Sequence, residues 1–586
     1  MNRNTELHFK NTPQINLKRS KFDMSHSMNT TLNVGEIVPI FLEQDVLPGD
    51  TIQIDMSSIV RMATPIYPTF DNLYMDTYFF FVPNRLLWDN WAKFWGENDD
   101  PWIQQTEYTV PQITAPQGGW TEGTIADYLG VPTKISGLSI SALPFRAYAK
   151  IISDWFRDEN LSYICNYSKG DATVAGSNGG NYVTDCALGG KPALAAKMHD
   201  YFTSALPAPQ KGPSVNVPLG GTVPLSGSIT IPAQTVTAAS QSMWVGNGTK
   251  PSGTQAWTPE FNNMGSSAAK YTLFANQAAG TGGATLQRAT SAGSINGEAA
   301  TIQNAYVNKP AQNITIPQHT GTSTGTIDLS QATAATINQL RTAFAIQKYY
   351  ENAGLHGTRY IEYLRGVFGV TSSDARLQRA EYLGGKRTPI GMDAVVQTSS
   401  TDSTSPQGNV GAFSCTIDKN SMFTKSFEEH GIVMGLAVIR CEHTYQQGLA
   451  RGWSRKKWTD YYNPFFAHLG EQAILNKEIY AQGNAQDDQA FGYQEAWADY
   501  RYKPSYVTGY MRSNASGTLD AWHYADKYTS KPTLSHDWIV EPKTNIDRTI
   551  AVTSQLMHQF IGNWYFKAIY TRPMPVYSVP GLIDHV

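Results

Sequence analysis

The alternation of hydrophobic and polar residues along the chain first indicates β-strands. TIQIDM at Thr51–Met56 alternates residue by residue, directly after the turn-forming sequence LPGD. Similar patterns occur further along, at Leu73–Val82, Phe413–Ile417, Gly431–Arg440 and Asn563–Tyr570. Because strands that could pair lie near both ends of the chain, the pattern predicts a mainly β fold. We expect a β-sandwich of jelly-roll type with long helical and loop insertions between its strands.

The predicted strand Leu73–Val82 is unusual because both of its faces are mostly apolar. Side chains alternate between the two faces along a strand. One face would carry Leu73, Met75, Thr77, Phe79 and Phe81, and the other Tyr74, Asp76, Tyr78, Phe80 and Val82. A sandwich buries only one face between its sheets. We therefore expect Tyr78 and Phe80, with Trp88 and Trp91 of the following segment, to pack against an insertion or a neighbouring subunit.

A second, longer period predicts helices. In Phe145–Asn160 the apolar residues Tyr148, Ile151, Ile152, Trp155 and Phe156 recur at the spacing of one buried helical stripe. We expect this helix and Trp88–Trp95 to cover the second face of the strand Leu73–Val82. Two further helices are predicted at Gln331–Gly354, with Gly354 as its C-terminal stop, and at Thr358–Gly369.

Composition changes sharply between residues 206 and 330, which contain only eight charged residues. Short β-like pieces occur at Ser228–Val236 and Asn313–Gln318. Structureless loops longer than about 15 residues are uncommon, so we interpret this stretch as an inserted β-rich subdomain that stands off the main body. A disordered linker is the alternative. Five isolated aromatic residues favour a small core or a binding surface: Trp244, Trp257, Phe261, Tyr271 and Phe274.

Charged residues make up only 16% of the 586 residues. An average globular protein has about a quarter. Such a low charge density fits a protein with extensive assembly contacts, or a secreted β-rich protein, better than a large monomeric enzyme. The formal net charge of -3 gives no overall basic excess, so a nucleic-acid site would need local clusters of Lys and Arg.

The cysteines and the chain's hydropathy bear on its compartment. Cys165, Cys186, Cys415 and Cys441 are widely spaced, and we expect reduced, structural thiols. The first residues lack the apolar region of a secretory signal, and no run reaches about 18 consecutive apolar residues, so no membrane span is predicted. These features favour an intracellular product.

A search for catalytic chemistry finds no GxSxG, HExxH or GxxxxGK[ST] motif. The adjacent acidic pairs at 99–100, 428–429 and 487–488 are typical of solvated surface charge. Cys441, Glu442 and His443 are possible metal ligands, but three residues so close in sequence rarely reach one ion. We therefore expect no enzymatic activity, no cofactor and no metal.

Two basic clusters carry more weight. Residues 1–33 are predicted to form an extended arm with Arg3, Lys10, Lys18, Arg19 and Lys21. In the 451–458 loop, Arg451, Arg455, Lys456 and Lys457 interleave with Trp453 and Trp458. Cations that bind phosphates and rings that stack on unpaired bases are typical of single-strand binding. For the arm we favour nucleic acid. For the loop, a subunit contact with structural tryptophans is an equal alternative.

Several long segments outside 206–330 carry a specific likeness to one protein family. They are Leu47–Trp91, Gly357–Val370, Asp374–Ile390, His468–Tyr480, Tyr500–Ser513 and the ending RPMPVYSVPGLIDHV at Arg572–Val586. Through them the chain resembles the major capsid proteins of gokushoviruses, which are small single-stranded DNA phages of the microvirus family. The resemblance extends over nearly the whole chain outside 206–330.

The resemblance implies an eight-stranded jelly roll that self-assembles into a T=1 icosahedral shell around circular single-stranded DNA. In this family a long insertion between two strands rises at the threefold axes as a protrusion thought to meet the host, and residues 206–330 match it by position. A shell of net charge -3 subunits cannot neutralise a genome alone. We therefore expect a small basic DNA-packaging protein as a partner, besides other minor virion proteins and a bacterial surface receptor. The protein would be assembled in the host bacterial cytoplasm and located in the virion.

The sequence thus predicts four parts. Residues 1–33 form the basic arm, and 34–205 the first part of the jelly-roll core with a helical insertion. Residues 206–330 form the low-charge β-rich protrusion, and 331–586 carry helices, the remaining strands and the C-terminal segment. The alternative is a secreted β-sandwich protein that binds or degrades polysaccharides through exposed tryptophans. The missing signal sequence and the lack of a plausible acid pair argue against it.

Overall fold

The computed structural model describes residues 18–97, 107–213, 215, 221–231, 234–237, 270–272, 287–289, 313–316, 319–329, 337–401 and 406–577. The chain divides into two compact units. One comprises Met1–Ser214 together with Gln347–Val586, and the other comprises Val215–Ile346. The smaller unit contains most of the insert predicted at 206–330, but it begins and ends further toward the C-terminus than predicted.

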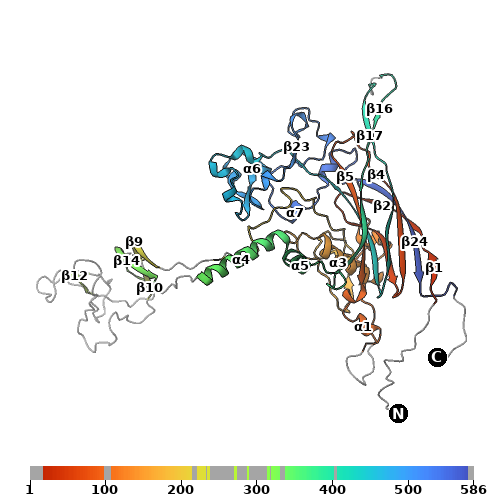
Figure 1. Cartoon of the computed structure of the whole chain (residues 1–586), viewed down its shortest axis with the longest axis horizontal. Coiled ribbons are helices and arrows are strands. Elements are labelled where there is room, and N and C mark those ends of the chain that lie inside the picture. Colours follow the sequence, from red (N-terminus) through yellow and green to blue (C-terminus); the bar gives the residue numbers. More distant parts are fainter. Residues whose placement is uncertain are drawn as a thin grey trace, which may run out of the picture. The chain divides into compact units, whose positions relative to one another are not determined.

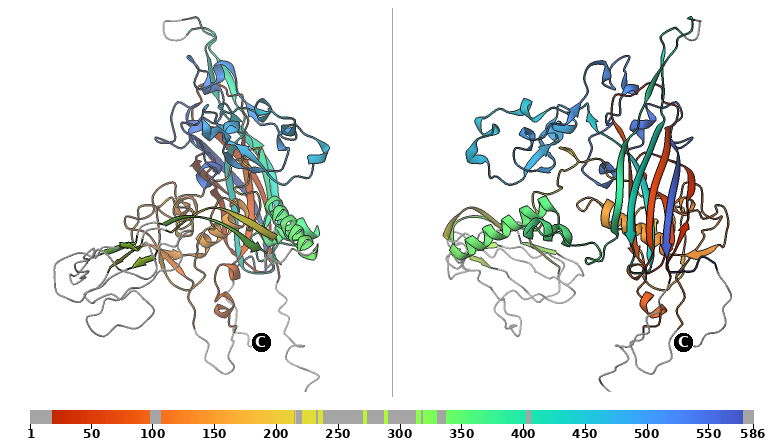
Figure 2. Two further views of the ribbon diagram at one scale, coloured as in Figure 1. Left: turned by 90° about the vertical axis from the view of Figure 1, so that its left-hand side faces the viewer. Right: turned by 45° about the vertical axis from the view of Figure 1, so that its right-hand side comes forward.

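Two antiparallel sheets form the body of the larger unit (Figures 1 and 2). The first has the order β1/β2–β24–β4–β18, where β1 (Ser20–Asp23) and β2 (His26–Leu32) pair with successive parts of β24. Its other strands are β24 (Phe560–Arg572), β4 (Thr51–Met62) and β18 (Thr416–Ser426). The second sheet has the order β15–β5–β19–β3 and comprises β15 (Glu381–Pro389), β5 (Leu73–Pro83), β19 (Gly431–Cys441) and β3 (Val38–Val46).

The strand order is that of an eight-position jelly roll, because β1 and β2 share one place at the edge of the first sheet. Along the chain the strands pass from one sheet to the other, except at β5 and β15, which are neighbours in the second sheet. This confirms the predicted mainly β fold. The largest insertion lies between β5 and β15, and the next largest between β19 and β24.

The two faces of β5 enter two different hydrophobic cores. Leu73, Met75, Phe79 and Phe81 pack between the sheets with residues of the first sheet such as Phe566. On the other face, Phe80 and Val82 join a second core, formed with the insertion between β5 and β15. The alternation predicted from the sequence is therefore confirmed, and the insertion covers the outer face of the second sheet.

Helix α3 (Leu143–Ile151) and the π-helical turn Ile152–Phe156 form the centre of that cover. Every residue of α3 is buried, and Phe145, Tyr148 and Ile151 belong to the second core. The helical segment ends at Phe156 rather than at the predicted Asn160. The rest of this insertion contains the long helix α4 (Ile337–His356) and shorter elements: α1 (Trp91–Phe94), β6 (Gln112–Thr114), α2 (Ile125–Tyr128), β7 (Ser139–Ser141), β8 (Val174–Ala175) and α5 (Tyr360–Phe368).

The insertion between β19 and β24 has little regular structure but a core of its own. Phe491 and Trp538 from this segment pack with Tyr201 and Phe202 of the earlier insertion. Its elements are β20 (Thr444–Tyr445), β21 (Gln472–Leu475), α6 (Asn476–Ile479), β22 (Ala490–Gln494), β23 (Ser505–Tyr506), α7 (His536–Ile539) and α8 (Thr544–Asp547). A hairpin of β16 (Asp393–Val396) and β17 (Val410–Phe413) extends beyond the ends of the sheets (Figures 1 and 2).

The smaller unit is β-rich in its described part. β9 (Gly221–Ile231) pairs with β14 (His319–Leu329), and β10 (Gln234–Thr237) pairs with β13 (Asn313–Ile316). β11 (Lys270–Thr272) pairs with β12 (Gln287–Ala289). These nested antiparallel pairs bring the start and the end of the unit together.

Three local predictions need correction. Phe413–Ile417 is not one strand, because Ser414 and Thr416 turn their hydroxyl groups to the backbone of Gly391 and separate β17 from β18. Gly354 lies inside α4, which ends at His356, and Gly357 with its positive φ follows instead. The predicted arm is shorter than residues 1–33, because residues 20–32 form β1 and β2 along β24.

Candidate functional site

Two arginines of the 451–458 loop hold its fold and face inward. The Arg451 guanidinium donates to the Ala473 carbonyl oxygen at 2.8 Å and lies 3.3 Å from Glu478 Oε1. Arg455 pairs with Asp499 and lies over the ring of Tyr500, 4.4 Å from its centroid. Both guanidinium groups are therefore engaged within the protein. Both arginines are candidate DNA contacts from the sequence, and in the structure they contact groups of the same chain.

The remaining residues of the loop face outward. Trp453 is 82% exposed and Trp458 is 71% exposed, and Lys456 and Lys457 are exposed between them. Asp460 Oδ2 accepts hydrogen bonds from the backbone N–H groups of Lys456 and Lys457, both at 2.8 Å. These two hydrogen bonds hold the backbone turn that carries the exposed side chains. Two cations and two rings on a held backbone match the requirements for binding an unpaired strand.

A hollow of about 640 Å³ lies beside the 451–458 loop. Its lining includes Trp453 from the loop, and Tyr500, Tyr502, Lys503 and Tyr506 from β23 and the segment before it. The prediction from sequence missed this second segment, although the alternation of rings and cations in YRYKP at Tyr500–Pro504 is the same signal as in the loop. Together the two segments form one aromatic and basic surface.

The other predicted contact residues are placed as follows. Lys18, Arg19 and Lys21 are exposed at β1, on the edge of the first sheet. Arg3 and Lys10 lie outside the described residues, as do Trp244, Trp257, Phe261 and Phe274. Tyr271 lies in β11, opposite Arg288 of β12.

The four predicted packing residues meet in the second core, Tyr78 and Phe80 from β5 and Trp88 and Trp91 from the start of the insertion that covers it. Phe80 is 1% exposed and contacts the rings of Trp155, Phe156 and Tyr382. Tyr78 packs edge-on against Phe156. Trp88 is fully buried and donates its Nε1–H to Asp171, and Trp91 packs against it at the border of the same core.

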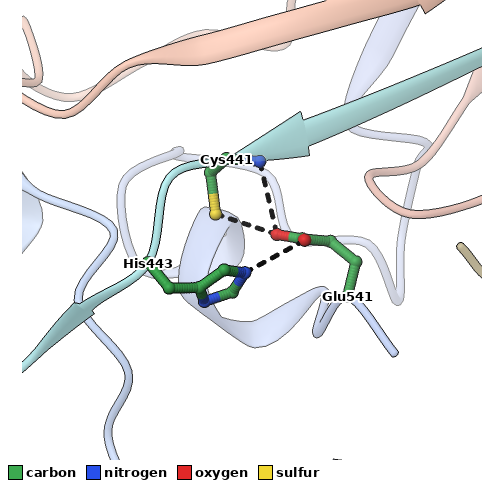
Figure 3. A group of neighbouring side chains, drawn as sticks. All are labelled: Cys441, His443 and Glu541. Atoms are coloured by element: carbon green, nitrogen blue, oxygen red, sulfur yellow. Dashed lines mark hydrogen bonds and ion pairs between the residues drawn. The ribbon is translucent and has the colours of Figure 1, made fainter. Parts of the chain in front are cut away.

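A buried polar network lies where β19 ends (Figure 3). Glu541 Oε1 is 2.8 Å from Cys441 Sγ, and Glu541 Oε2 is 3.0 Å from His443 Nε2. The other ring nitrogen, His443 Nδ1, lies 2.9 Å from Asp526 Oδ1, and Lys197 Nζ lies 2.9 Å from Asp526 Oδ2. The network joins the end of the second sheet to both large insertions. All four cysteines of the chain carry free thiols, as expected.

The electrostatics of the network follow from burial and pairing. Burial by itself lowers the pKa of His443, but the two carboxylates Asp526 and Glu541 overcome this and raise it to about 10. The pKa of Asp526 is held well below its usual range, because Lys197 and His443 outweigh the effect of burial. Burial and the neighbouring Glu541 raise the pKa of the Cys441 thiol.

Comparison with known proteins agrees with the fold. Capsid protein VP1 of Spiroplasma virus 4 is 42% identical over 570 residues, covering 97% of this chain and 96% of that protein. Capsid protein VP1 of Chlamydia phage 1 is 40% identical over 614 residues, covering 98% and 97%. Capsid protein VP1 of Bdellovibrio phage phiMH2K is 41% identical over 581 residues, covering 99% and 98%.

A jelly-roll sandwich with extensive insertions and full-length likeness to capsid proteins defines a structural protein of a viral shell. The chain belongs to the capsid protein (F protein) family, whose family model matches residues 11–582. The resemblance to gokushovirus major capsid proteins is thereby confirmed. The protein is therefore located in the virion. Its membership of the capsid protein family argues against the alternative of a polysaccharide-binding protein. Within the ranges that the structure describes, no helix combines the length and apolar character needed to cross a membrane.

Proposed function

We propose that this capsid protein self-assembles into a T=1 icosahedral shell that encloses a circular single-stranded DNA genome. The observation that carries the proposal is the eight-position jelly roll in a chain that matches phage capsid proteins over almost its full length. Association would be driven by apolar area buried between subunits, about 25 cal/mol per Å² before entropic costs. Closed symmetry repeats each contact around the shell.

Electron microscopy of the purified protein tests assembly directly. We expect uniform small particles whose reconstruction shows icosahedral symmetry with every subunit in an equivalent position, as T=1 requires. A monomer that never forms closed particles, even from infected cells, would reject the proposal. A larger triangulation number would reject only the T=1 part.

The aromatic and basic surface is our candidate contact with the genome. Lys456 and Lys457 would neutralise phosphates, and Trp453 and Trp458 would stack on bases, since all four are exposed. Arg451 and Arg455 would support the loop through Glu478 and Asp499 instead. Lys18, Arg19 and Lys21 at β1 would add a second contact.

Salt titration of single-strand binding measures this contact. The double variant Lys456→Ala, Lys457→Ala should flatten the dependence of log K on log salt by roughly one unit for each lysine. A variant with Lys18, Arg19 and Lys21 changed to Ala tests the second contact in the same way. Exposed Lys134 and Lys527, changed to Ala together, serve as the control and should leave the slope unchanged. Equal slopes for all variants would reject both contacts.

The smaller unit, Val215–Ile346, is our candidate for host attachment. Its low charge and its insertion between two strands support a surface protrusion that contacts a bacterial receptor. Because the chain's net charge is -3, we further propose that a small basic packaging protein or cations neutralise the rest of the genome, alongside other minor virion proteins. Assembly would take place in the host cytoplasm.

A further inference from the structure

The buried network at the end of β19 contains the donor atoms of a metal site. Cys441, His443 and Glu541 are all buried, and one ligand atom from each lies within 4.8 Å of the other two (Figure 3). Glu541 follows Cys441 by 100 positions in the sequence. Glu442, the neighbour that made a shared ion implausible from the sequence, forms hydrogen bonds elsewhere, with Asn72 and Tyr74.

The donor set matches zinc. Thiolate, imidazole and carboxylate are the groups that bind Zn²⁺ in proteins, whereas Ca²⁺ and Mg²⁺ prefer oxygen alone. Glu541 presents one oxygen to Cys441 and the other to His443, so it can supply one or both. The opposite ring nitrogen of His443 faces Asp526, the carboxylate–histidine pairing that orients imidazole ligands of zinc.

The charges of the network allow Zn²⁺ to replace two protons. His443 has a carboxylate oxygen at each ring nitrogen, so both nitrogens carry protons in the metal-free network. With Lys197 and His443 positive and Asp526 and Glu541 negative, its four ionised side chains sum to zero. If Zn²⁺ enters, the Cys441 thiol and His443 Nε2 each lose a proton to solvent. Two positive charges replace two protons, so the buried site stays neutral.

We propose that Cys441, His443 and Glu541 form a structural zinc site, with Asp526 orienting His443. The metal would join the last residue of β19 to the segment after α7 (His536–Ile539), and through Asp526 and Lys197 to the insertion between β5 and β15. Zinc would thus fasten the second sheet to both insertions that cover it. Because the site is buried, the metal would be taken up as the chain folds.

Metal analysis of particles purified from zinc-supplemented cells tests the site. We expect about one zinc per chain in the wild type and a loss of at least about tenfold in Cys441→Ser and Glu541→Gln. Cys415→Ser is the matched control, since that cysteine lies outside the cluster, and it should keep the metal. Asp526→Asn should weaken retention against a chelator by about 10- to 100-fold.

Cobalt substitution reports thiolate ligation directly in the wild-type chain. The full chain refolded with Co²⁺ alone should show a thiolate-to-cobalt charge-transfer band, present in Cys415→Ser and absent from Cys441→Ser. Wild-type particles without zinc, together with refolded chain lacking the band, would overturn the proposal. Zinc that persists in Cys441→Ser would also overturn it, because the metal would then be bound elsewhere.

Discussion

Phe80 is the residue whose burial depends most directly on the insertion, because it lies on the outer face of β5 under Trp155 and Phe156. Phe80→Ala should lower the free energy of unfolding by about 3–5 kcal/mol, since it removes a large buried ring and leaves a cavity. Urea unfolding of unassembled subunits measures the change. Phe465→Ala is the control, because Phe465 is 93% exposed and should shift the same quantity by less than about 0.5 kcal/mol. Equal effects would mean that the insertion does not cover β5.

Asp76, also on the outer face of β5, depends on pairing rather than on apolar contact. Its carboxylate is 2% exposed and accepts hydrogen bonds from Arg387, at 2.7 Å and 2.9 Å, and from Arg440. Burial alone would raise the pKa of Asp76, but the two arginines lower it below its usual value. A folded-state pKa below the unfolded one stabilises the protein above the unfolded pKa. That contribution disappears as the pH falls through the folded pKa.

We therefore expect Asp76→Asn to destabilise the subunit by about 3 kcal/mol at neutral pH, because it leaves Arg440 without its charge partner. The difference from wild type should begin to shrink below about pH 4, where the carboxyl group of the unfolded chain becomes protonated, and should vanish as the pH falls through the lower folded-state pKa. Urea unfolding at several pH values measures both effects. The control Glu122→Gln removes an exposed pair with Lys134 and should change nothing measurable. A difference that is independent of pH would contradict the role of the Asp76 charge.

The edge strands β15 and β18 meet at Gly384, which closes one side of the sandwich. A Cβ atom at Gly384 would lie 2.3 Å from the carbonyl oxygen of Met422 in β18, closer than real contacts allow. The register of β15 on β5 also shifts between Tyr382 and Gly384, so this strand bends where the sheets approach. The sandwich can close here only because this residue lacks a side chain.

Gly384→Ala should accordingly destabilise the fold by about 1–3 kcal/mol, through overpacking of backbone against backbone. The measurement is the midpoint of urea unfolding. Gly391→Ala provides the control, because an added Cβ there meets no heavy atom within 4 Å. If Gly384→Ala were as stable as Gly391→Ala, the two edges would not be in tight contact.

The division of the chain into two units predicts that assembly and attachment can be separated. Replacing Val215–Ile346 with a short flexible linker should leave the jelly-roll unit folded and able to form shells. Adsorption of virions to host cells should be lost if this unit contacts the receptor. Electron microscopy measures the first outcome and an adsorption assay the second. Normal adsorption would reject attachment through the unit, and absence of particles would show that assembly needs it.

Local periodicity in the sequence located several of the elements, among them β4, β5, β19, β24 and α3. The alternation of β5 assigned Phe79 and Phe80 to opposite sides, and helical spacing located α3, because both patterns depend only on neighbouring residues. Composition likewise distinguished residues 206–330 from the rest of the chain. The resemblance to capsid proteins supplied the strand number, which no local pattern contains.

Tertiary structure alone decided which distant residues meet. It paired residues 20–32 with β24, turned Arg451 and Arg455 inward to Glu478 and Asp499, and placed Glu541 beside Cys441 and His443. These contacts join segments that are far apart along the chain, so no periodic pattern in the sequence indicates them. The free energy that selects them comes from the packing of whole sheets and insertions. Hence the sequence identified chemically capable residues, and the fold determined which of them are exposed and which face each other.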